Sequence, residues 1–245
     1  MRFWRRSGAI FEKMGSFQTF WSGLDWSVFR DMLFRILPAL VCITLHELAH
    51  GLVAYRLGDP TAKSAGRLSL NPLRHIDWLG LAMMVGFGFG WAKPVPVDMR
   101  RFRNPRAGMA LTAAAGPLCN LVLGVLFLFI YGLVYSALAR VGTDTAYAVL
   151  QSVSSAASLS LALTVFNLIP IPPLDGSKIL SYCFSDSFYT KYYVKFLRYE
   201  RYGMILLLAV VASGVLGSPL SAATGWLYDR LFVFAQWGYA LMNRP

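Results

Sequence analysis

The residues best suited to chemistry in this chain are two histidines and a glutamate in the pentapeptide His46-Glu47-Leu48-Ala49-His50. On a helix, side chains four positions apart lie on one face about 5–6 Å apart, so both imidazoles can bind one metal ion. The glutamate can then reach a metal-bound water as a general base. Chance produces such a pentapeptide in a chain of this composition on the order of once in two thousand sequences. The pattern predicts one Zn²⁺ per chain, with His46 and His50 as ligands and Glu47 as the catalytic base.

A catalytic zinc site also needs a third protein ligand and an open position for water. The candidates are Asp175, Asp77, His75 and the three cysteines at positions 42, 119 and 183. Asp175 follows residues 167–174, where prolines break a helix and unwound backbone can line a wet cavity. An ordinary turn aspartate is the other interpretation of Asp175, because glycine follows it.

The composition indicates that these residues belong to a membrane protein. Hydrophobic residues make up 56% of the chain and charged residues only 14%, whereas soluble domains carry about a quarter charged residues. Apolar blocks at 32–57, 108–139 and 146–169 are long enough to cross a hydrocarbon layer of about 30 Å. The net charge of +11 comes mainly from loops between these blocks. Basic loops of this kind are typically retained on the cytoplasmic side of a membrane, and this position argues against a nucleic-acid partner.

The blocks predict an all-α polytopic membrane protein with about four to six membrane segments. Residues 78–91 are too few to span and contain four glycines, which predicts a small re-entrant or β element between the first two core helices. A last apolar region, 203–241, is interrupted at 217–219. We therefore expect an amphipathic interfacial segment at 1–31, a catalytic membrane core at 32–180 and C-terminal membrane helices at 181–245.

Three motifs, in this order along the chain, resemble those of the site-2 protease family of intramembrane zinc metalloproteases, peptidase family M50. They are HELAH (46–50), AGPLCN (115–120) and NLIPIPPLDG (167–176). The resemblance covers about residues 33–180 and is to the compact bacterial type without PDZ or CBS domains. It implies that His46, His50 and Asp175 bind zinc and that Glu47 is the catalytic base. It also implies a catalytic role for Asn120 as a hydrogen-bond donor to substrate or oxyanion, with a helix-packing amide as the alternative.

These expectations describe a multi-pass protein of a bacterial cell membrane that hydrolyses peptide bonds of membrane-spanning protein substrates in regulated intramembrane proteolysis. Its expected partners are the substrate and the lipid bilayer. The extended segment 93–98, in which prolines alternate with valines, can offer a sheet edge to an unwound substrate.

The alternatives are a non-proteolytic zinc-binding membrane scaffold and a metal transporter. A transporter needs ionisable residues along a path through several helices. Blocks 108–139 and 146–169 contain no Asp, Glu, Lys, Arg or His, which favours one concentrated catalytic site.

Overall fold

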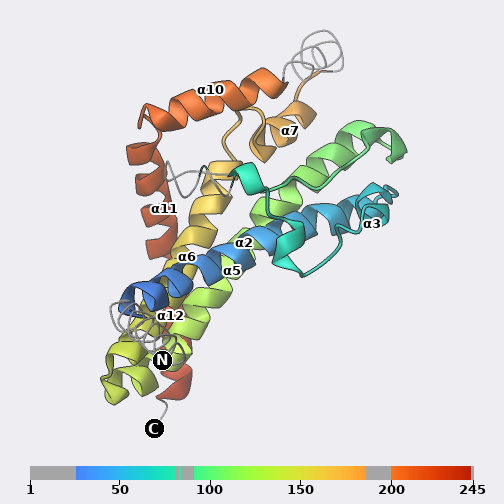
Figure 1. Ribbon diagram of the computed structural model, residues 1–245. Helices are drawn as coiled ribbons and strands as arrows, with labels where there is room; N and C mark the ends of the chain where they lie inside the picture. Colours follow the sequence, from blue (N-terminus) through green and yellow to red (C-terminus); the bar gives the residue numbers. More distant parts are fainter. Residues whose placement is uncertain (1–25, 81–82, 84–90, 186–199, 244–245) are drawn as a thin grey trace, which may run out of the picture.

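The structure, a computed structural model, describes residues 26–80, 83, 91–185 and 200–243. Three long helices lie side by side and form the body of the molecule (Figure 1). They are α2 (Trp26–Arg56), α5 (Pro105–Val141) and α6 (Asp144–Asn167). Residues 1–25 of the predicted interfacial segment 1–31 lie outside the described residues. Helix α2 begins at Trp26, inside that predicted segment.

The pairing of α5 with α6 follows from the signals that end one helix and start the next. Gly142 ends α5 in the left-handed conformation at φ 64°, which glycine adopts without a steric penalty. Thr143 then caps α6, because its hydroxyl accepts a hydrogen bond from the Ala146 N–H at 3.3 Å. So short a connection places the two helices antiparallel, as the apolar blocks at 108–139 and 146–169 predict.

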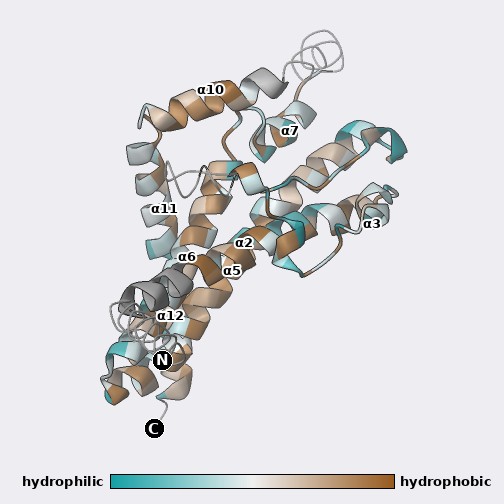
Figure 2. Ribbon diagram, viewed as in Figure 1, coloured by the Kyte–Doolittle hydropathy of each residue, from teal (hydrophilic) through white to brown (hydrophobic). Residues whose placement is uncertain are grey.

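Among the described residues, three helices are long and apolar enough to cross a membrane: the part of α2 from Ile36 to Arg56, α5 and α6. Residues 203–212 and 217–242 of the described chain would make a fourth span if they are counted together, and they are bent by 86° at the break between them. Figure 2 shows the hydrophobic colouring concentrated on these helices. The chain is thus a mostly helical membrane protein, and the predicted count of four to six segments is not confirmed.

Residues 200–243 form three helices, α10 (Glu200–Ala212), α11 (Gly217–Leu231) and α12 (Val233–Met242). The predicted interruption at 217–219 was misplaced, because these residues form the first turn of α11. Proline is tolerated at that position, where its missing N–H has no intrahelical acceptor. The break lies just before it, where Gly214 has φ 74°.

The connection between α2 and α5 is mostly irregular. It contains α3 (Thr61–Ser64) and two 3₁₀ turns, η1 (Pro72–Arg74) and η2 (Met99–Arg101). Within the described residues there is no strand, only one isolated bridge between Ile76 and Ala92. The predicted re-entrant or β element is therefore not confirmed, and residues 81–82 and 84–90 of it lie outside the described part of the chain.

A buried carboxylate fixes the two ends of this connection to each other. Asp59 is fully buried and accepts hydrogen bonds from the Thr61 N–H at 3.0 Å and from the Asp98 N–H at 2.7 Å. Asp98 in turn accepts from the Arg100 side chain, and this hydrogen bond holds the pKa of Asp98 below its usual range. The segment 93–98 is consequently held next to the end of α2.

Candidate functional site

The structure brings together His46 and His50 of α2 and Asp175, the first residue of α7 (Asp175–Tyr182). The Nε2 atoms of the two imidazoles lie 3.0 Å apart. Asp175 Oδ2 lies 3.3 Å from His46 Nε2 and 3.2 Å from His50 Nε2. All three side chains are buried, so three ligand-type atoms form a nearly equilateral triangle inside the protein.

The dimensions of this triangle fit zinc. A tetrahedral zinc ion with bonds of about 2.0–2.1 Å holds its nitrogen and oxygen ligands about 3.3 Å from one another. The three observed edges are close to that value and correspond to one face of a tetrahedron. Two imidazoles and one carboxylate are also a ligand set of catalytic zinc sites, in which the fourth position is left to water or substrate.

Helix α5 makes room for the two imidazoles at Gly116. A Cβ atom built on Gly116 would lie 2.6 Å from His46 Nε2 and would meet His50 Nε2 as well. Such separations are far inside van der Waals contact, so only glycine lets the α5 backbone approach α2 this closely. Gly116 belongs to the AGPLCN motif, but its function was not predicted.

The same face of α5 orients both rings. Thr112, Gly116 and Asn120 are spaced four apart and therefore follow one another along one side of the helix. His50 Nδ1 lies 2.7 Å from the Thr112 carbonyl oxygen, and His46 Nδ1 lies 3.0 Å from Asn120 Nδ2. Histidines that bind a metal through Nε2 have such partners at Nδ1, and these partners fix the tautomer and the ring orientation. The Thr112 contact could not be predicted, because it uses a backbone atom.

Two further contacts place α7, and with it Asp175. A side chain at Gly176 would collide with the backbone carbonyl of Leu168, so the glycine of the LDG sequence lets α7 start directly against the end of α6. At the other end of α7, the Arg106 guanidinium donates hydrogen bonds to the carbonyls of Ser181 at 2.9 Å and Tyr182 at 3.0 Å. Arg106 thereby satisfies carbonyls that a helix end leaves without partners.

Glu47 faces the segment 93–98 from its position between the two histidines. Its Oε2 accepts a hydrogen bond from the Val95 N–H at 3.0 Å. The Lys93 N–H donates to the His75 carbonyl, and prolines 94 and 96 have no N–H to offer. The predicted sheet edge therefore has no free N–H donor between residues 93 and 96.

The other candidates for the third ligand lie outside the cluster. His75 is buried, with Nε2 2.8 Å from the Ser69 carbonyl oxygen. Asp77 accepts hydrogen bonds from the backbone N–H groups of Leu79 and Gly80. It is thus an ordinary turn aspartate, the interpretation that the sequence also allowed for Asp175. The three cysteines are free thiols. Within the described part of the chain, His46, His50 and Asp175 are the one group found that can hold a metal ion.

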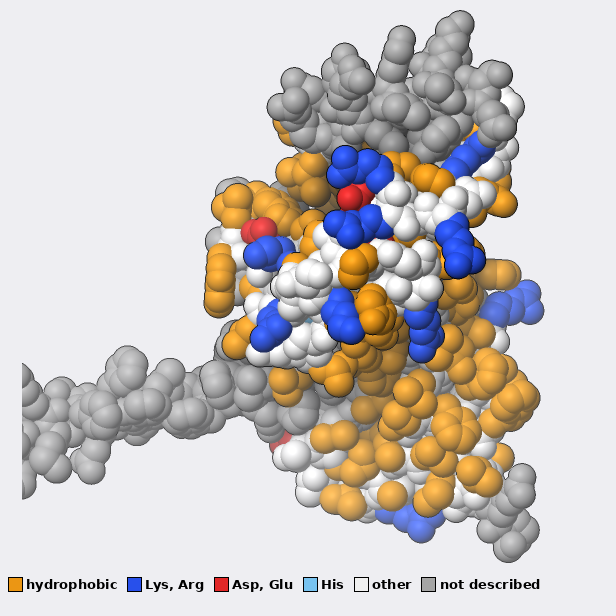
Figure 3. Space-filling model, turned by 90° about the vertical axis from the view of Figure 1, so that its right-hand side faces the viewer, with side chains coloured by type: hydrophobic (Ala, Val, Ile, Leu, Met, Phe, Trp, Pro, Cys, Tyr) orange, Lys and Arg blue, Asp and Glu red, His pale blue; other side chains and the backbone are white. Residues whose placement is uncertain are grey.

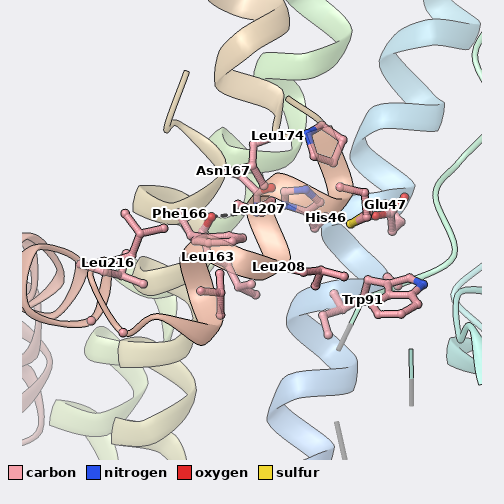
Figure 4. Close-up of a pocket in the computed structure, with 18 residues that line it drawn as sticks. His46, Glu47, Trp91, Leu163, Phe166, Asn167, Leu174, Leu207, Leu208 and Leu216 are labelled. Atoms are coloured by element: carbon pink, nitrogen blue, oxygen red, sulfur yellow. Dashed lines mark hydrogen bonds between the residues drawn. The ribbon is translucent and has the colours of Figure 1, made fainter. Parts of the chain in front are cut away.

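A cavity of about 390 Å³ opens beside the cluster. Figure 4 shows His46 and Glu47 at one side of it, and Leu163, Phe166, Asn167, Leu207, Leu208 and Leu216 around the rest. The lining is almost entirely apolar, and much of it comes from α10 and α11. Sequence reasoning did not assign these helices to the site, because their apolar residues have no distinguishing pattern.

Comparisons with known proteins point to one family. The model of peptidase family M50 matches residues 34–211. The chain is 37% identical over 201 residues to the protein named "Putative zinc metalloprotease YwhC" of Bacillus subtilis (strain 168), covering 80% of this chain and 85% of that protein. It is 35% identical over 146 residues to "Putative zinc metalloprotease Rip2" of Mycolicibacterium smegmatis, covering 56% of this chain and 52% of that protein. No solved structure matches the chain. The extent of the family match shows that the chain belongs to peptidase family M50, the site-2 protease family.

Proposed function

We propose that this protein is a multi-pass zinc metalloprotease of a bacterial cell membrane that hydrolyses peptide bonds of membrane-spanning proteins. One observation carries the proposal. The zinc-sized triangle of His46, His50 and Asp175 lies beside Glu47 at the side of an apolar cavity. A candidate metal site, a candidate base and room for an apolar segment in one location support hydrolysis of a membrane-spanning substrate.

Each polar residue of the site has a separate task. When bound, zinc held by His46, His50 and Asp175 supplies a Lewis acid that polarises a carbonyl and lowers the pKa of water. Glu47 takes a proton on its carboxylate and returns it to the leaving amine. The Val95 N–H donates to Glu47 Oε2, which holds the carboxylate in place beside the two histidines.

Asn120 acts in this proposal as a positioning residue for His46. For Nε2 to bind a metal, Nδ1 must carry the hydrogen, so its partner must be an acceptor. An amide offers its oxygen or its nitrogen to the same neighbour by a half turn about its last side-chain bond. Asn120 is fully buried, and its Oδ1 finds no other partner within the described residues. Its oxygen is thus available to accept the His46 Nδ1–H.

Substitutions of Asn120 test whether its side chain orients His46 or contacts the substrate directly. We expect Asn120→Leu, which offers no acceptor, to weaken zinc affinity about 10- to 100-fold, whereas Asn120→Asp keeps an acceptor and stays within about threefold of wild type. Competition with a chromogenic chelator measures both affinities. Thr112→Val is the matched control, because it removes a buried hydroxyl that has no hydrogen-bond partner among the described residues and keeps the backbone carbonyl that contacts His50. If both Asn120 variants bind zinc as wild type does and both lose cleavage, Asn120 is instead a donor to the substrate.

The proposed function is tested with purified protein in detergent and a panel of single-span substrates. We expect cleavage of at least one substrate by the untreated protein, loss of cleavage after zinc is removed with a chelator, and recovery after zinc is returned. Cleavage that continues at full rate in metal-free protein would contradict the proposal.

A further inference from the structure

A second cavity, also of about 390 Å³, lies in the connection between α2 and α5, away from the metal cluster. It is lined by residues 65–67 after α3, by the end of η1 and the residues that follow it, and by Lys93. Unlike the cavity beside the metal cluster, it carries mainly charged and polar groups. Arg67, Arg74 and Lys93 face it together with one acid, Asp77. We call it the Arg67 pocket.

The cations of this pocket have no acidic partner within the described residues. The ion pairs of Arg100 and Arg101 are with Asp98 and Asp59, and none joins the pocket cations to a carboxylate. The carboxylate of Asp77 is directed to backbone instead, since Oδ1 accepts from the N–H groups of Leu79 and Gly80. The pocket therefore presents an excess of two positive charges.

Arg67 shows that the pocket is built rather than a chance gathering of surface side chains. Only 7% of the residue is exposed, which is unusual for arginine unless it is paired. Its Nη2 donates to the Lys93 carbonyl at 2.5 Å, which fixes the guanidinium in the wall of the pocket. A buried guanidinium with no carboxylate partner leaves an uncompensated positive charge, which favours an anion in the pocket.

The rim of the pocket is apolar. Trp78 is 71% exposed and Leu73 63% exposed, and both line the pocket. An exposed tryptophan beside basic residues is typical of the level at which lipid headgroups lie. Figure 3 shows Lys and Arg side chains gathered above the hydrophobic surface of the molecule, which is consistent with a boundary between membrane and water at this level.

We propose that the Arg67 pocket binds a phosphate group, carried by an anionic phospholipid or present as the free anion. Guanidinium groups bind phosphate oxygens with paired hydrogen bonds, and Lys93 adds a third positive charge. The volume exceeds what a phosphate needs and leaves room for the ester substituent of a headgroup, whose acyl chains would follow the apolar rim.

Binding is measured by native mass spectrometry of the full chain with phosphatidylglycerol, and with phosphatidylcholine as the neutral lipid. We expect wild type to retain one phosphatidylglycerol preferentially and Arg74→Gln/Lys93→Gln to reduce its apparent affinity on the order of tenfold. Both side chains are exposed, so the fold is expected to persist. Arg56→Gln/Arg103→Gln is the matched control, because it removes the same charge from exposed positions outside the pocket.

A titration with inorganic phosphate shows whether the pocket binds the free phosphate anion or the phosphate group of a lipid. Free phosphate that displaces the lipid from wild type supports a site for the anion itself. Lipid that stays bound supports recognition of the whole headgroup. Equal losses in the pocket and control variants, or equal retention of phosphatidylcholine and phosphatidylglycerol by wild type, would overturn the proposal.

Discussion

Replacement of Glu47 by glutamine should abolish peptide hydrolysis while zinc remains bound. The amide oxygen of glutamine can still accept the Val95 N–H, which now donates to Glu47 at 3.0 Å, so the side chain keeps its anchor. An amide cannot take a proton from water, and loss of a general base costs about 10²–10⁴-fold in rate. Cleavage of a single-span substrate and zinc content of the purified variant measure the two expectations separately.

Glu47→Leu is the companion variant, because it removes both the base and the hydrogen bond to Val95. A comparison of the two variants by thermal unfolding shows what the anchor contributes to stability, and we expect only Glu47→Leu to be destabilised, by about 1 kcal/mol. Retention of wild-type cleavage by Glu47→Gln would show that another group acts as the base.

Replacement of Asp175 by alanine should have the largest effect on the metal. The carboxylate supplies one of three atoms in the triangle, at 3.2–3.3 Å from the two histidine nitrogens. Loss of a group that only orients a metal ligand weakens binding about 10- to 100-fold, and we expect loss of a ligand itself to exceed that range. Chelator competition measures the affinity, and elemental analysis measures the zinc retained after gel filtration.

Asp144→Ala is the control for Asp175→Ala. Asp144 is also an aspartate in the first turn of a helix, but it is exposed and lies outside the metal group. The control should bind zinc as wild type does. Unchanged zinc affinity in Asp175→Ala would assign the third ligand to another residue.

The parts of this protein that could be predicted from sequence are those that depend on local spacing. The four-residue interval between His46 and His50 fixes both imidazoles on one face of α2, whatever the rest of the chain does. The long apolar blocks likewise predicted α5 and α6, because a membrane requires helices of that length.

The remaining features depend on contacts between distant segments. The Nδ1 partners of the two histidines come from α5, and one of them is the backbone carbonyl of Thr112. No pattern of residue types reveals a carbonyl. Similarly, nothing local to Val95 shows that its N–H donates to Glu47. The break before α11 was misplaced because proline can begin a helix as well as end one.

Zinc X-ray absorption spectroscopy of the purified, zinc-loaded chain tests whether His46, His50 and Asp175 together hold one zinc ion. We expect one zinc per chain, with nitrogen and oxygen neighbours at about 2.0–2.1 Å and the multiple-scattering signature of two imidazoles. A sulfur neighbour at about 2.3 Å, or the signature of a single imidazole, would contradict it.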